Sequence, residues 1–88
     1  MKLILAIMRD SDNETVSQAL VSVGYRVTRI ASTGGFLRRG SSTLIIGTDD
    51  DKVDQAIEVI RTNLGPATEP TANRANLFVL NVEQFNQI

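Results

Sequence analysis

Arg26 and Thr28 are the first residues of this chain whose types and spacing suit a binding site. They lie two positions apart in the segment from Tyr25 to Ala31, which is rich in β-branched and aromatic residues and predicts a strand. In a strand both side chains emerge on one face, where a guanidinium beside a hydroxyl can hold a phosphate. Two solvated strand residues, or an Arg26 paired with an acid of a neighbouring subunit, would give the same pattern.

The stretch TGGFLRRG, from Thr33 to Gly40, is the second candidate. Thr33, Gly34 and Gly35 permit the positive φ angles that turn successive backbone N–H groups toward one point, which makes an anion-binding nest possible. An ordinary chain reversal between two strands would also place glycines here.

Phe36 and Leu37 also favour a binding role for this loop. Adjacent large apolar residues in a connection between two strands have no core of their own chain to enter, so we expect them to cover a ligand or to dock on a neighbour. A purine stacked on Phe36 would contribute about 1 to 3 kcal/mol. Arg38 and Arg39 could attract a phosphate, although simple solvent exposure is the better explanation for at least one of them.

The distribution of charge favours a small anionic ligand. The net charge is only −1, which argues against a nucleic acid polymer or an anionic membrane surface as partner. However, no acid occurs from Thr15 to Thr48, and this segment contains four arginines: Arg26, Arg29, Arg38 and Arg39. The acids gather on either side of it, at Asp10, Asp12, Glu14, Asp49, Asp50, Asp51 and Asp54. The second acidic group could bind Mg²⁺, but position in the first turn of a helix explains it without a metal.

The chain has no histidine and no cysteine. Zinc sites built on these residues, serine triads and thiolate chemistry are therefore excluded, and the composition fits a reducing compartment. The apolar run from Leu3 to Met8 is too short for a signal sequence or a membrane span, so we expect a cytoplasmic protein without membrane insertion.

The hydrophobic pattern predicts alternating strands and helices. Apolar or β-branched runs predict four strands, at Leu3 to Met8, Tyr25 to Ala31, Thr43 to Gly47 and Leu77 to Val82. The first helix should begin at a capping box formed by Ser11 and Glu14, carry its apolar stripe on Val16, Ala19, Leu20 and Val23, and end at Gly24. The second should run from about Asp50 to Leu64, with the stripe Val53, Ala56, Ile57, Ile60 and Leu64, and stop at Gly65 and Pro66. Thr33 to Ser42 and Pro66 to Ala75 are expected to be loops.

The order strand, helix, strand, strand, helix, strand predicts one α+β domain over residues 1–88 with the ferredoxin-like plan. Its four-stranded antiparallel sheet should carry both helices on one face. Because three of the strands are apolar on both faces, the uncovered face should be buried by self-association, and we expect a homo-oligomer in the form of a closed ring.

The segments MKLILAIMRDSD, YRVTRIASTGGFLRRGSSTLIIGTDDDKVDQAIEVI and LFVLNVEQFNQI together resemble the PII-like cyclic di-AMP receptor family of bacterial signalling proteins. The resemblance covers nearly the whole chain, and its most specific part is RVTRIASTGGFLRRG. It implies a non-enzymatic homotrimer with cyclic di-AMP in each cleft between subunits.

The resemblance also implies roles for individual residues. Arg26 and Thr28 would contact phosphate and ribose, and Gly35, Phe36 and Leu37 would enclose one adenine, with Arg38 and Ser41 nearby. Gly47 would line the second adenine pocket, and Gln87 would close the site from the adjacent subunit. The implied partners are the chain itself, the nucleotide and a downstream protein that the sequence does not identify; no cofactor is implied.

Three departures from the family pattern leave other functions open. Gly24 and Ser41 stand where the family commonly has Asn, and the connection from Pro66 to Asn76 is short. A trimer that binds another adenine nucleotide, or an interaction trimer without ligand, is therefore an alternative. A hydrolase of the acylphosphatase type is a weaker one, since it needs a water-orienting amide that Gly24 cannot supply.

Overall fold

Four strands and two α-helices form in the predicted order in the computed structural model, which describes residues 1–30, 40–66 and 73–88. The strands are β1 (Lys2–Arg9), β2 (Arg26–Ile30), β3 (Ser41–Thr48) and β4 (Ala75–Asn81). The helices are α1 (Asp10–Ser22) and α2 (Val53–Asn63), and the 3-10 turn η1 (Asp50–Lys52) leads into α2. This arrangement confirms the predicted α+β, ferredoxin-like fold.

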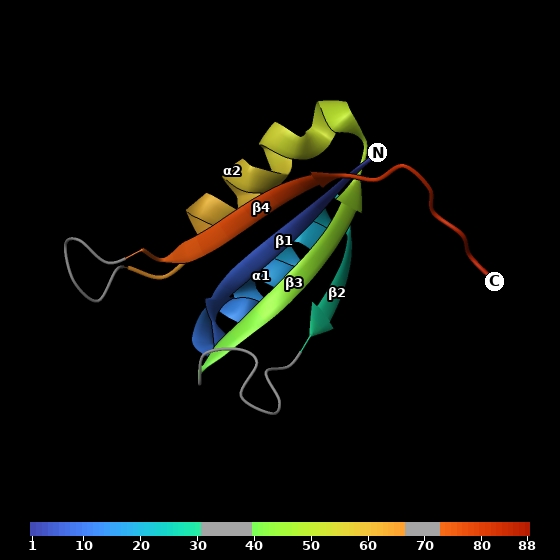
Figure 1. Cartoon of the computed structure of the whole chain (residues 1–88). Coiled ribbons are helices and arrows are strands. Elements are labelled where there is room, and N and C mark those ends of the chain that lie inside the picture. The colour runs from blue at the N-terminus through green and yellow to red at the C-terminus, as the bar shows by residue number, and fades with distance from the viewer. Residues whose placement is uncertain (31–39, 67–72) are drawn as a thin grey trace.

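The strands make one antiparallel sheet in the order β2-β3-β1-β4. Both helices lie behind the sheet in Figure 1, so the opposite face, toward the viewer, has no helix over it. Register fixes which residues share a face of the sheet, because directly paired residues of antiparallel strands point the same way. Ile4, for example, pairs with Ile46 on one side and Val79 on the other.

The hydrophobic core lies between the sheet and the two helices. Alternate residues of the central strands are fully or almost fully buried there, together with the apolar stripes of the helices: Ile4, Ala6, Met8, Leu44, Ile46, Val16, Leu20, Ala56 and Ile60. Burial of each large aliphatic side chain contributes about 1.5 to 3 kcal/mol. The core is therefore one-sided, as the number of helices requires.

The start of α1 differs from the prediction. The helix begins at Asp10 directly after β1, its N-cap residue is Arg9 without a side-chain cap, and Ser11 lies inside the first turn, so the predicted capping box is wrong. The far end agrees with the prediction at Gly24, whose φ of +96° suits glycine. Val23 is not part of the buried stripe: it follows the last helical residue and is 50% exposed.

Two strands begin two residues earlier than their apolar runs predicted. β3 already begins at Ser41, so Ser41 and Ser42 belong to the strand and not to the loop. Ser42 is buried, and its hydroxyl accepts a hydrogen bond of 2.8 Å from the buried amide of Asn13. β4 begins at Ala75, two positions before the predicted start. Both strands extend to these residues because their backbones pair with β1, and the hydrophobic pattern of a sequence gives no signal for such pairing.

Asp12 ties the beginning of α1 to the end of α2. Its buried carboxylate accepts hydrogen bonds from the backbone N–H of Gly65 and from Nε of Arg9, both at 3.0 Å. Arg9 Nη2 also lies 3.0 Å from the same carboxylate. One side chain thus joins β1, α1 and the residues that follow α2.

We expect Asp12→Ala to lower the free energy of unfolding by about 1 to 3 kcal/mol, because a buried N–H and a guanidinium lose their acceptor. Urea denaturation at one fixed protein concentration measures it. Asp10→Ala is the matched control: Asp10 is exposed in the same helical turn, and its loss should stay below about 1 kcal/mol. Equal losses in both variants would contradict the role given to Asp12.

Candidate functional site

The uncovered face of the sheet is apolar in the middle and polar along β2. Leu3, Leu5 and Ile45 lie half-buried on it, while Phe78 and Leu80 of β4 are 52% and 47% exposed. On β2 the register places Arg26 opposite Gly47, Thr28 opposite Ile45 and Ile30 opposite Thr43, all on this same face. The name open face is used below for this surface.

A groove of about 410 Å³ runs along the open face beside β2. Three of the predicted site residues, Arg26, Thr28 and Gly47, line this groove. The register of β2 and β3 brings them together. Its other lining residues are Ile45 of β3 and four residues from near the two ends of the chain: Met1, Leu3, Val82 and Phe85. A guanidinium and a hydroxyl thus stand over an apolar floor, which suits a ligand that carries both an anionic group and a flat apolar ring.

A second depression of about 310 Å³ adjoins this groove at the end of α1. The two share Met1, Arg26 and Gly47. The rest of its lining is mostly polar and comes from the segment after α1, the end of β3 and the start of α2: Val23, Gly24, Tyr25, Thr48, Asp49, Lys52 and Gln55. Arg26 therefore stands between two concavities and can reach a ligand that fills both.

Tyr25 fixes the wall of the second depression. It is only 7% exposed, and its hydroxyl donates to the carbonyl oxygen of Lys52 at 2.8 Å and lies 3.2 Å from Oε1 of Gln55. Burial raises the pKa of the Tyr25 phenol above its ordinary value of 10.0, and the nearby carboxylate of Asp51 raises it further. The phenol thus stays neutral and continues to hold the first turn of α2 in place.

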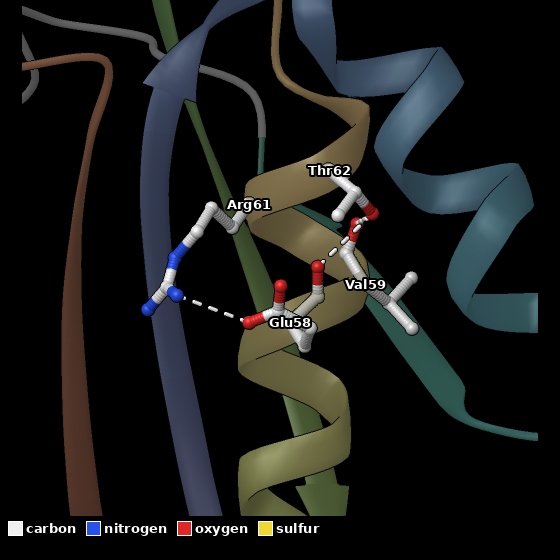
Figure 2. Close-up of polar contacts among 4 residues, drawn as sticks. All are labelled: Glu58, Val59, Arg61 and Thr62. Carbon is white, nitrogen blue, oxygen red and sulfur yellow. Dashed lines mark hydrogen bonds and ion pairs between the residues drawn. The ribbon is translucent and has the colours of Figure 1, made fainter.

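The arginines divide into those with and without an acidic partner in the described part of the chain. Arg9 pairs with Asp12, and Arg61 pairs with Glu58 at 3.0 Å within α2, as Figure 2 shows. In the same view the Thr62 hydroxyl donates to the carbonyl oxygens of Glu58 and Val59. The polar side chains of Arg61 and Thr62 therefore bond to groups of the same helix. Arg26 forms no ion pair with any described residue and is free to meet an anion.

The remaining predicted site residues are not gathered in the groove. Gly35, Phe36, Leu37 and Arg38, with the rest of the predicted nest, lie outside the described residues. Ser41 stands at the other end of β3 from Gly47, which is about 20 Å along a strand. Gln87 lies in the exposed tail after β4 and does not line the groove of its own chain. The roles of these residues stay predictions.

The second group of acids lies at the start of η1 and at the start of α2. Asp49 holds the N-cap position of η1 without a side-chain hydrogen bond, Asp50 and Asp51 lie within η1, and Asp54 is in the first turn of α2. Across residues 1–30, 40–66 and 73–88 no group of three acidic, histidine or cysteine side chains is arranged to hold a metal ion. Within the same ranges no helix has the length and apolar character needed to cross a membrane.

Most lining residues of the two concavities were missed by the sequence analysis, and Val82, Phe85, Lys52 and Gln55 show why. Val82 and Phe85 follow β4, and a short tail gives no periodic signal that would place them. Lys52 and Gln55 stand on the polar side of the predicted second helix, where exposed residues are the norm. Only the pairing of β2 with β3, which brings Gly47 beside Arg26, shows that this helix start borders the site.

Comparison with known proteins agrees with the resemblance described above. The sequence profile of the family described as cyclic-di-AMP receptor matches residues 1–70. A solved structure, described as a functionally unknown protein from Pediococcus pentosaceus ATCC 25745, superposes with a TM-score of 0.78 at 29% sequence identity. The superposition covers 99% of this chain and 96% of that one, so the two share the fold over their whole lengths.

Tyr25 should make the protein lose stability at high pH. Because its pKa is raised in the folded state, its contribution is complete below pH 10.0, the ordinary pKa, and is lost as the pH rises through the folded value. The chain has a single tyrosine and no tryptophan, so tyrosinate absorbance in an alkaline titration reports Tyr25 alone. We expect a midpoint above that of the unfolded protein in denaturant. Equal midpoints would contradict the buried, bonded phenol.

Proposed function

We propose that this chain, which belongs to the cyclic-di-AMP receptor family, is a signalling protein that binds cyclic di-AMP in clefts between the subunits of a homotrimer. One observation carries the proposal: Arg26 and Thr28 stand over an apolar groove on the one face of the sheet that no helix covers. In this function the protein binds cyclic di-AMP and releases it without converting it.

The chemistry of the groove suits a cyclic dinucleotide. Arg26 can donate paired hydrogen bonds to a phosphate, and Thr28 can donate to a phosphate or a ribose oxygen. Gly47, opposite Arg26, has no side chain of its own, and the flexible side chain of Met1 lies over it. A volume of about 410 Å³ is within the range of small-molecule sites.

Two adjoining concavities also suit a ligand with two bases. Cyclic di-AMP carries its two adenines on either side of a ring that contains both phosphates. Arg26 and Gly47 belong to both concavities, so the phosphate ring would lie at their junction, with one adenine toward Phe85 and the other toward Gly24. Phe36 and Leu37, the residues that the resemblance assigns to an adenine, would complete the first base pocket.

Self-association completes the proposed site. The open face exposes large apolar side chains, and a monomer rarely leaves a contiguous patch of this kind in water. A neighbour packed on the open face would bury Leu5 and Phe78 and would wall the groove on its open side. Gln87 would reach the site from that neighbour, which agrees with its position outside the groove of its own chain.

Arg26→Ala should weaken the binding of cyclic di-AMP at least about tenfold, because a charge-assisted hydrogen bond to the phosphate is lost. Isothermal titration calorimetry measures the change. Arg29→Ala is the matched control: Arg29 is exposed on the same strand but pairs with Leu44, on the other face of the sheet. We expect its affinity to equal that of the wild type.

Three results would count against the proposal. Absence of binding by the wild-type protein would favour an interaction trimer without ligand. Tighter binding of ATP than of cyclic di-AMP would favour another adenine nucleotide. Equal affinity of Arg26→Ala and the wild type would show that the site lies elsewhere.

Phe78→Asp should dissociate the proposed trimer, because the substitution places a carboxylate in the apolar contact between subunits. Size-exclusion chromatography with light scattering gives the mass, and circular dichroism checks that the fold is kept. Val21→Asp on α1 is the control, since Val21 is 58% exposed but lies away from the open face. A wild-type monomer, or a Phe78→Asp variant that keeps the trimer mass, would contradict the assembly on this face.

A further inference from the structure

We infer that Gln55, assisted by Lys52, recognises the ligand's adenine at the Gly24 end of the site. The inference rests on the proposed function, because it names the residues that read one base of the same ligand. It concerns the second depression, whose wall comes from the start of α2.

Gln55 and Lys52 line a concavity that is continuous with the groove of Arg26. The two spaces share Arg26 and Gly47, so a ligand phosphate held by Arg26 directs an attached nucleoside into either of them. Both residues are exposed, and their polar ends are therefore available to a ligand.

The amide of Gln55 is held in place before any ligand arrives. Its Oε1 lies 3.2 Å from the hydroxyl of Tyr25, and that hydroxyl also donates to the backbone of Lys52, one turn earlier, at 2.8 Å. Tyr25 itself is buried, which fixes the position of its ring. Because the single proton of that hydroxyl goes to Lys52, the hydrogen-bond network orients the amide with its NH₂ group toward the Tyr25 oxygen and leaves the amide oxygen to accept. Adenine presents a donor, its N6 amino group, where guanine presents an acceptor, O6, so this amide distinguishes the two bases.

Gly24 leaves room for the base on the other side of the depression. A Cβ built on Gly24 would meet no atom within 4 Å, so the space beside it is open. The backbone at Gly24, with a φ of +96°, disfavours a side chain. The polar contact that an amide at this position would make can therefore be made from the opposite wall, by Gln55.

Lys52 supplies charge where the depression would otherwise be negative. Asp49 lines the same space, and a carboxylate there repels a phosphate. The ammonium of Lys52 opposes this effect and adds to the attraction exerted by Arg26. We therefore assign Gln55 to the base and Lys52 to the phosphate.

Isothermal titration of Gln55→Met with cyclic di-AMP and with cyclic di-GMP tests the inference. We expect binding of cyclic di-AMP to weaken about 5- to 50-fold, the usual effect of losing one hydrogen bond to a buried base. Cyclic di-GMP should change less, so the preference for adenine should shrink. Lys52→Met should weaken both ligands by similar factors. Gln18→Met, on the exposed side of α1, is the matched control and should bind as the wild type does.

A second variant separates recognition from packing. Gln55→Lys keeps an N–H donor for the oxygen of the Tyr25 hydroxyl and loses the amide oxygen, so thermal stability should stay near that of the wild type while the preference for cyclic di-AMP over cyclic di-GMP falls. Wild-type binding together with unchanged affinity and base preference in Gln55→Met would overturn the inference alone. Failure of the wild type to bind cyclic di-AMP would overturn the proposed function and the inference with it.

Discussion

Two helices can cover only one face of a four-stranded sheet, and the other features of this protein follow from that limit. The covered face holds the buried core, with Ile4 and Ile46 at its centre. The opposite face keeps a row of aliphatic and aromatic side chains in contact with water, at an energetic cost that a partner would remove. Since β2 is an edge strand and its register places Arg26 and Thr28 on this same face, the proposed anion-binding groups border the apolar surface.

This common location ties ligand binding to assembly in the proposed trimer. A site completed by a neighbouring subunit binds its ligand only in the assembled state, so the ligand should stabilise the assembly by mass action. In each subunit Arg26 would bind the phosphates of the ligand, because it lines both concavities and forms no ion pair with the described acids. In the proposed site, a departure such as Gly24 would change which residue contacts a base, while Arg26 would still hold a phosphate.

The fold was largely predictable, because alternating burial and helical stripes report which faces meet the core. Arg26, Thr28 and Gly47 could also be placed, since a two-residue spacing in a strand fixes a common face. The failures have local causes. Ser11 has the spacing of a capping box, yet β1 runs straight into α1 and the cap falls on Arg9. Ser41 is polar and looks like loop, but backbone pairing with Arg9 makes it strand.

The missed residues depend on tertiary contacts that no spacing records. Asp12 was only one acid of the charge pattern, whereas its bond to the Gly65 N–H spans the two helices. Gln55 is an ordinary exposed helix residue until Tyr25 is placed beneath it. Phe85 reaches the groove only because the tail follows β4 back past Met1, whose carbonyl oxygen accepts from the Val82 N–H.

Native mass spectrometry of the wild-type protein with cyclic di-AMP tests the link between the open face and the ligand most directly. We predict a trimer that carries up to one cyclic di-AMP per chain, with no ligand on any residual monomer. A monomer that binds the nucleotide would contradict the claim that the neighbouring subunit completes the site, and a trimer that binds none would contradict the claim that the groove of Arg26 is a nucleotide site.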